Sequence, residues 1–188
     1  MRLLTGAFLD DPAWRCIGPR NRAYRRLIMR AWFPGALAVA RRWGGPSWAA
    51  HRDGSLIGVA VCFDSGRFAP AGRRQLYEVA FLLAGPGPIA RSQRVQEVMD
   101  LHRPREPHLY LWLLGAAPEA QRTGVGRALL AEVSSYADAR GLPVYLETMN
   151  PDNVSYYLGH GFRVRGTAGM PRGEQAWFML RASCQGSG

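Results

Sequence analysis

The stretch LLGAAPEAQRTGVGRALL, residues 113–130, decides the fold of this chain of 188 residues. An apolar run over residues 108–115 leads into it and predicts a β-strand. Apolar side chains recur at helical spacing through residues 124–140, which predicts an amphipathic helix. The sequence therefore predicts a strand that leads through a short loop into a helix.

The loop carries two glycines, Gly124 and Gly126, together with two arginines, Arg122 and Arg127. The first amides of a helix have no partners inside the helix, and they favour negative charge. Glycines let an anion come close to those amides, and the arginines add positive charge. The loop therefore predicts a cradle for a phosphate. The alternative is a glycine-containing helix start that binds no ligand.

Two other phosphate-binding motifs do not fit this loop. A dinucleotide fingerprint requires a third glycine at position 129, where the chain has Leu129. A P-loop requires lysine, and all 24 basic residues of the chain are arginines. The absence of lysine also excludes Schiff-base chemistry, including the usual attachment of pyridoxal phosphate.

The composition is typical of a globular protein. Apolar residues make up 47% and charged residues 20%, and the formal net charge is +10. The arginines are scattered, so most of this charge is expected on a solvated surface rather than in a nucleic-acid site.

The cysteines Cys16, Cys62 and Cys184 lie far apart, which argues against a disulfide framework and a zinc site. No apolar run is long enough to span a membrane, and we expect a reducing cytoplasm.

The segments after the helix predict a mixed α/β fold. Residues 144–149 predict a strand, and Asn150 followed by Pro151 predicts the start of a short helix. Residues 162–165 and 175–180 predict two further strands across a turn rich in glycine and proline. The order strand, helix, strand, helix, strand, strand is typical of a mixed α/β domain.

The first half of the chain has weaker patterns. Residues 20–33 predict a basic amphipathic helix, which we place on the surface; the alternative is a helix that faces nucleic acid. Apolar runs at residues 47–51 and 56–63 flank Asp53 and Gly54, and this pattern predicts a β-hairpin.

Residues 76–101, the last part of the first half, contain a run of glycine and proline. Residues 76–84 form an apolar run, which ends at the helix-breaking sequence GPGP of residues 85–88. Ser92 is then expected to cap a helix that continues to about Leu101.

Two motifs carry a resemblance to a known family. Residues 121–126 read QRTGVG, and residues 153–162 read NVSYYLGHGF. These resemble the motifs Q/R-x-x-G-x-G/A and N-x-x-x-Y-x-x-x-G-F of the GNAT acyltransferase superfamily, and the similarity extends over residues 102–181. Within that superfamily, the blocks HRPREP, YLET and WFM, which begin at residues 102, 145 and 177, resemble puromycin N-acetyltransferase and its relatives.

The resemblance implies the mixed α/β fold of GNAT acyl-CoA N-acyltransferases, with acetyl-CoA or another acyl-CoA as donor. The first strand would run beside the pantetheine arm of CoA, and the loop would hold its pyrophosphate. The implied cofactor-binding residues are Leu114, Gly115, Ala116, Gln121, Arg122, Thr123, Gly124, Val125, Gly126 and Arg127. The resemblance also implies a bulge in that strand, which frees an N–H to stabilise an oxyanion.

Two residues are expected to carry the chemistry. Tyr157 matches the family's general acid, which gives a proton to the leaving thiolate; the alternative is a buried tyrosine with a satisfied hydroxyl. Its neighbour Tyr156 is then expected to face the core. Glu147, on the strand beside the donor strand, is either the base that deprotonates the acceptor ammonium, directly or through water, or a carboxylate satisfied by an arginine.

Two asparagines qualify for a contact with the pantetheine arm. Asn153 is our first choice, and Asn150 comes second because it also caps a helix. The four histidines show no metal-ligand spacing, so no metal site is predicted. His160 is expected to be a cation at the C-terminal end of a helix.

The chain departs from the superfamily near its N-terminus. Relatives open with a β-strand before the first helix, whereas residues 1–12 resemble the middle of that helix. We therefore expect the first edge strand to be missing, through a late start codon or a true loss, and the exposed neighbouring strand to favour a homodimer or lower the stability. The pairs Ala116-Ala117 and Arg122-Thr123 also replace more usual residues, and neither change prevents backbone binding.

The expected organisation is one domain over residues 1–188. Residues 1–100 would shape the acceptor side, residues 101–182 would bind acyl-CoA, and residues 183–188 would form a tail. Aromatic residues of the first half are expected mostly in the core, with some lining an acceptor pocket. They are Trp14, Trp32, Phe33, Trp43, Trp48, Phe63, Phe68, Tyr77 and Phe81.

The expected function is the transfer of an acetyl or other acyl group from acyl-CoA to a primary amine of a small molecule, in antibiotic resistance or biosynthesis. The alternatives are acetylation of a peptide or protein amine, a degenerate CoA-binding module, and a basic module that binds nucleic acid. We expect a small-molecule partner, no nucleic-acid or membrane partner, and a monomer or homodimer.

Overall fold

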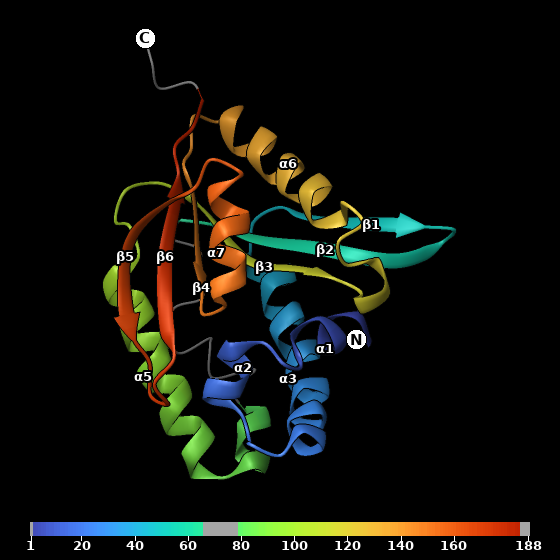
Figure 1. Cartoon of the computed structure of the whole chain (residues 1–188), viewed down its shortest axis with the longest axis vertical. Helices are drawn as coiled ribbons and strands as arrows, with labels where there is room; N and C mark the ends of the chain where they lie inside the picture. Colours follow the sequence, from blue (N-terminus) through green and yellow to red (C-terminus); the bar gives the residue numbers. More distant parts are fainter. Residues whose placement is uncertain (1, 66–78, 185–188) are drawn as a thin grey trace.

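The computed structural model describes residues 2–65 and 79–184 of the chain. These residues form a six-stranded sheet in the order β1-β2-β3-β4-β6-β5, with helices packed on both faces (Figure 1). The neighbouring strands are antiparallel except β3 and β4, which are parallel. The predicted mixed α/β fold is confirmed.

The elements follow the predicted order. The strands are β1 (Ser47–Arg52), β2 (Ser55–Asp64), β3 (Leu109–Ala116), β4 (Val144–Thr148), β5 (Arg163–Gly169) and β6 (Gln175–Arg181). The α-helices are α1 (Arg2–Phe8), α2 (Pro12–Ile17), α3 (Arg22–Trp43), α5 (Pro86–His102), α6 (Val125–Asp138) and α7 (Pro151–Leu158). Two 3₁₀ turns are η1 (Val79–Ala84) and η2 (Pro118–Ala120).

Several turns take the conformation that their residues favour. Asp53 and Gly54 both have positive φ, of 51° and 74°, as the predicted two-residue hairpin turn requires. Gly124 caps α6 with φ of 90°, and Gly141 follows the helix with φ of 64°. Glycine takes these values without strain, which fixes both ends of α6. The side-chain oxygen of Asn150 caps α7, as predicted.

In the first half, one predicted helix is confirmed but is longer than expected, and one expected helix cap is wrong. The helix predicted over residues 20–33 continues through Pro34 to Trp43, because Ala36 and Val39 pack into the core on its second half. Ser92 does not cap a helix; it is buried inside α5, which begins earlier, after Gly85. A proline in the first helical turn lacks only an N–H that would have no partner, so the GPGP sequence starts this helix instead of breaking it.

The two faces of the sheet are covered by different parts of the chain. α6 and α7 pack on one face, over buried residues that include Cys62, Leu111 and Leu146. α2, α3 and α5 pack on the other face, over residues that include Phe63 and Tyr145. The sheet therefore lies between α6 and α7 on one side and α2, α3 and α5 on the other.

The described part of the chain begins with α1 at Arg2. Within the described residues no strand precedes α1, and β1 is an outer strand of the sheet. None of the described helices is both long and apolar enough to cross a membrane. Of the expected tail, residues 185–188 lie outside the described part, as do residues 76–78 of the apolar run before η1.

Candidate active site

The two parallel strands separate at the centre of the sheet. Backbone pairing between them is confined to Leu109 with Val144 and Tyr110 with Tyr145, although β3 continues to Ala116. The side of β3 beyond Tyr110 that faces β4 therefore presents backbone N–H and C=O groups which the ladder between the two strands does not pair. Such groups are ready to bind an extended ligand.

β3 also carries the expected bulge. Val61 of β2 pairs with Leu113, whereas Cys62 pairs with Leu111, so Trp112 is an extra residue in β3. A bulge bends its strand and redirects the neighbouring groups. Here it lies where β3 leaves β4, and Trp112 contributes to the wall of a cavity described below.

A groove of about 630 Å³ runs along the end of β3 and the start of α6. Its lining includes nine of the residues expected at acyl-CoA: Leu114, Gly115, Ala116, Gln121, Arg122, Thr123, Gly124, Gly126 and Arg127. Val125 is the exception, because its side chain is buried in the core and faces Gly58. Only the backbone amide of Val125 remains for a ligand in the groove.

The loop of this groove has the geometry of an anion cradle. The amides of Val125 and Gly126 belong to the first turn of α6, where the helix supplies no acceptor. A Cβ on Gly126 would lie 3.2 Å from the Tyr156 hydroxyl, so glycine keeps this side of the groove open. Arg122 has φ of 61°, a conformation that is strained for a residue with a side chain. The groove fits a phosphate-bearing ligand such as CoA.

Arg52, at the end of β1, is a neighbour of the cradle that the sequence did not reveal. Its guanidinium donates a hydrogen bond to the Thr123 hydroxyl at 3.3 Å, and that hydroxyl donates to the Ala120 carbonyl at 2.8 Å. Arg52 and Thr123 are 71 positions apart, and no local pattern joins them. The contact adds a third arginine close to the loop.

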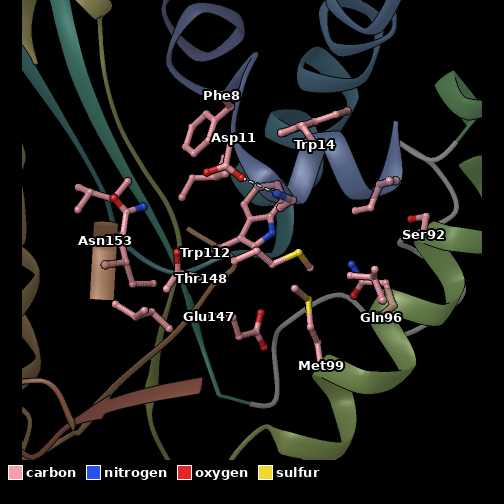
Figure 2. A pocket seen from close by; sticks show the side chains of 18 of the residues that line it. Phe8, Asp11, Trp14, Ser92, Gln96, Met99, Trp112, Glu147, Thr148 and Asn153 are labelled. Carbon is pink, nitrogen blue, oxygen red and sulfur yellow. Dashed lines mark hydrogen bonds between the residues drawn. The ribbon is translucent and has the colours of Figure 1, made fainter. Parts of the chain in front are cut away.

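A cavity of about 170 Å³ is lined by residues of the strands β3 and β4 and of the helices α2, α5 and α7 (Figure 2). Its aromatic walls come from α1, α2, α3, η1, β3 and α7, and they consist of Phe8, Trp14, Trp32, Phe81, Tyr110, Trp112 and Tyr157. Three of the aromatic residues named from the first half therefore line it.

The other aromatic residues of the first half lie elsewhere. Phe33 and Phe63 are core residues, and Trp48 packs edge-on against Tyr136. Phe68, Tyr77 and the side chain of Trp43 lie outside the described part.

The groove and the cavity meet at Leu114, Asn153 and Tyr157, which line both. Tyr157 is 8% exposed. Burial is the main cause that raises its pKa, followed by the charges of Tyr156 and Asp11. A raised pKa keeps the phenol protonated, which a general acid requires.

This placement bears on two neighbouring expectations. Tyr157 takes the more buried position, whereas Tyr156 is partly exposed, packs against the core as expected and also lines the groove. Asn153 reaches both hollows, whereas the side chain of Asn150 accepts a hydrogen bond from the amide of Asp152 and lines neither of the two.

Glu147 lies in the cavity wall with three donors around it. One oxygen accepts from the Tyr110 hydroxyl at 2.7 Å. The other accepts from the Tyr145 hydroxyl at 3.1 Å and from Arg103 at 3.4 Å. The side chain is 3% exposed, and burial raises its pKa, while Arg103 and the tyrosines lower it. Glu147 is thus a carboxylate paired with an arginine that also faces the cavity, and its role as a base stays a prediction.

His160 forms a local contact at the end of α7. Its Nδ1 lies 2.7 Å from the Tyr156 carbonyl oxygen, and its ring lies against the Tyr156 ring. Within residues 2–65 and 79–184, no three histidine, cysteine or acidic side chains group as metal ligands. All three cysteines are free, with Cys16 and Cys62 buried.

Sequence reasoning missed the residues that complete the cavity. Tyr110, Tyr145 and Arg103 hold Glu147 from two strands and from the end of α5. Asp11 enters the cavity wall from the turn between α1 and α2. The pair Asp11-Pro12 is a recognisable helix-start signal, but it does not say that the side chain lines a cavity.

Comparison with known proteins now identifies the family. Residues 7–162 match the model of the acetyltransferase (GNAT) family. The chain belongs to this family. Members use acetyl-CoA as co-substrate, so the protein is an N-acetyltransferase that takes its acyl group from acyl-CoA.

Solved structures share the fold of this GNAT protein. One is a Corynebacterium glutamicum protein described as histone acetyltransferase HPA2 and related acetyltransferase, with 22% identity and a TM-score of 0.67 over 99% of this chain and 90% of that one. Another is Naa20 of Chaetomium thermophilum in complex with a bisubstrate analogue, with 19% identity and a TM-score of 0.54 over 97% and 82% of the two chains. At these identities the likeness establishes the fold alone.

Proposed function

We propose that this GNAT acetyltransferase moves an acetyl group from acetyl-CoA directly to a primary amine of a small molecule. The supporting observation is the aromatic cavity that meets the donor groove at Tyr157. Its volume of about 170 Å³ is close to that of a protein cavity that holds one benzene ring. An extended peptide would leave backbone polar groups unsatisfied against such walls. The blocks at residues 102, 145 and 177 further support kinship with puromycin N-acetyltransferase and its relatives.

Acetyl-CoA supplies the acetyl group as a thioester when bound. The backbone of Leu114, Gly115 and Ala116 would pair with its pantetheine arm, and the loop amides with Arg122 and Arg127 would hold its pyrophosphate. Asn153 would contact the arm between groove and cavity, and Asn150 remains the second choice because its side chain caps α7.

Two side chains would move the protons. Glu147 would accept the proton of the acceptor ammonium, through water, because its own oxygens already accept hydrogen bonds from tyrosines and an arginine. Tyr157 would donate its proton to the leaving thiolate and regain one from the product nitrogen. The unpaired backbone of β3 would stabilise negative charge on the carbonyl oxygen.

The same proposal assigns the parts of the chain. Residues 1–100 would form the acceptor side and residues 101–182 the acyl-CoA side of one domain, acting as a monomer or homodimer. A cytoplasmic location is supported by the three free cysteines. A role in antibiotic resistance or biosynthesis would follow from the identity of the amine.

A panel of amines tests this proposal. The full chain is incubated with acetyl-CoA and either small aromatic and aliphatic amines or short peptides, and thiol release and product mass are measured. We expect acetylated small amines and no acetylated peptide. Acetylation of peptides alone would refute the small-molecule assignment, and CoA binding without any transfer would support a degenerate binding module.

A further inference from the structure

Asp11 is a carboxylate in the cavity wall that the chemistry above does not use. It precedes α2, and its Oδ1 accepts a hydrogen bond from the Ala13 amide at 2.9 Å. Figure 2 shows its side chain between Phe8 and Trp14, on the opposite side of the cavity from Glu147. The cavity therefore has an acidic group on each of two facing walls.

The two carboxylates differ in their partners. Glu147 is paired with Arg103, and on the surface Asp10 and Asp138 are paired with Arg22 and Arg181. Asp11 forms no ion pair with any basic side chain of residues 2–65 and 79–184, in a chain that carries 24 arginines. Burial raises its pKa to about 6, and hydrogen bonds from the Ala13 and Trp14 amides lower it only partly.

The capping role of Asp11 does not require its charge. Asparagine or serine caps a helix as well as aspartate, and neither has an ionised group to desolvate. A carboxylate that lines a cavity without a basic partner is explained if the bound ligand itself carries the positive charge. The aromatic neighbours Phe8, Trp14 and Trp112 suit such a ligand, because an ammonium group is attracted to aromatic faces.

Asp11 also lies near the reacting end of the cavity. Its charge is one of the causes that raise the pKa of Tyr157, after burial and Tyr156. The other titratable groups in the cavity wall are Tyr110 and Glu147, and both belong to the network of Arg103. Asp11 is thus the carboxylate left for a cation of the acceptor.

We propose that Asp11 attracts the ammonium group of the acceptor into the aromatic cavity, before Glu147 removes its proton through water, and thereby selects cationic amines with an aromatic body. The proposal rests on the proposed function, since it names the class of amine that would enter. Asp11 acts here as a specificity residue, and Glu147 keeps its role as the base.

The direct test measures binding without turnover. Benzyltrimethylammonium is an aromatic cation that cannot be acetylated, and neopentylbenzene is its neutral carbon isostere. Calorimetric titration of the CoA-bound protein at pH 8 should show binding of the cation at least tenfold tighter than of the isostere. Asp11→Asn keeps the helix cap and removes the charge, so it should weaken the cation about ten- to a hundredfold and leave the isostere unchanged.

The matched control is Asp10→Asn. Asp10 is the adjacent residue, its side chain is 59% exposed, and its change removes the same charge outside the cavity. It should alter the affinity for the cation less than threefold. A melting temperature of Asp11→Asn close to that of the wild type would establish that the variant is folded.

The outcomes separate the two proposals. Equal affinity for cation and isostere, no binding of either, or an unchanged affinity in Asp11→Asn would overturn the role of Asp11. Binding that depends on Asp11 in a protein that acetylates no small amine would instead count against the proposed function alone. Because Asp11 is ionised above a pH of about 6, affinity for the cation should also fall as the pH drops from 8 to 5, and should not do so in Asp11→Asn.

Discussion

The groove that we propose for the donor and the cavity that we propose for the acceptor meet at Tyr157, but they are built in different ways. The groove takes most of its lining from one stretch, residues 114–127, and relies on backbone amides, glycines and arginines. The cavity takes its lining from α1, α2, α3, α5, α7, η1, β3 and β4, and relies on aromatic side chains and two carboxylates. A site made of backbone depends on a few glycines, whereas a site made of side chains from distant segments changes with every substitution in its walls.

This difference suits the two ligands. The donor is the same in every turnover, and backbone amides recognise its phosphates through geometry and dipoles. A cavity that selects one amine among many, as we propose, requires side chains of particular shape and charge. Predictions for the two regions therefore differ in kind: changes in the groove should alter affinity for CoA, and changes in the cavity should alter turnover or choice of amine.

The largest effect is expected where the two regions meet. Tyr157→Phe removes the hydroxyl that would protonate the leaving thiolate, so kcat should fall by about one to three orders of magnitude while CoA still binds. Tyr156→Phe is the control, because it removes the same hydroxyl from a neighbour that lines only the groove. Steady-state kinetics in which both variants lose the same activity, or neither does, would remove Tyr157 from its role.

The next effect concerns the base in the cavity. Glu147→Gln should lower kcat about ten- to a hundredfold, because an amide cannot take a proton from the acceptor. Burial raises the pKa of Glu147, so the wild type should lose kcat as the pH drops through that pKa, and the variant should lack this loss. Glu132→Gln, at an exposed position of α6, is the control. A pH profile of kcat shared by wild type and variant would contradict the assignment.

A smaller effect tests the groove. Gly124→Ala places a side chain at φ of 90°, which costs about 1–2 kcal/mol and moves the first amides of α6. The Kd for CoA, measured by calorimetry, should rise roughly tenfold. Gly141→Ala introduces similar strain at the other end of the same helix, where φ is 64°. It should lower the melting temperature without changing CoA affinity; if it weakened CoA equally, the cradle would not depend on local geometry.

The smallest effect concerns Arg52. Arg52→Gln removes a charge next to Thr123, so CoA should bind about two- to threefold more weakly at low salt. The difference should vanish in high salt, because salt screens exposed charges. Arg163→Gln removes an exposed arginine from β5, at the opposite edge of the sheet, and should have no effect. Equal losses from both variants would indicate attraction by overall charge.

The sequence predicted the groove far better than the cavity. Gln121, Gly124 and Gly126 lie within six residues, and a strand, a loop and a helix start place them together without help from the rest of the chain. Asp11 and Glu147 line one cavity only because the folded chain brings the turn before α2 and strand β4 to its opposite walls. No local sequence pattern predicts that two residues so far apart in the chain line the same cavity.

The errors in the first half have the same origin. Pro34 and the GPGP sequence are local helix-breaking signals. Pro34 nevertheless lies inside α3, whose second half is held by packing in the core. Pro86 and Pro88 lie in the first turn of α5, where proline is tolerated. Glu147 could be placed on its strand from sequence, but the tyrosines that hold it come from two strands whose register is set by the whole sheet.

Because β3 and β4 separate after Tyr110, backbone groups on the β4 side of β3 have no partner in the ladder between these two strands. If the donor supplies that pairing, part of the free energy that keeps the chain folded comes from a metabolite. A ligand present at a hundred times its Kd adds about 2.7 kcal/mol to the stability of the state that binds it. The lifetime of this protein in a cell would then depend on the supply of acetyl-CoA, because a chain without the donor unfolds more often and is more exposed to proteolysis.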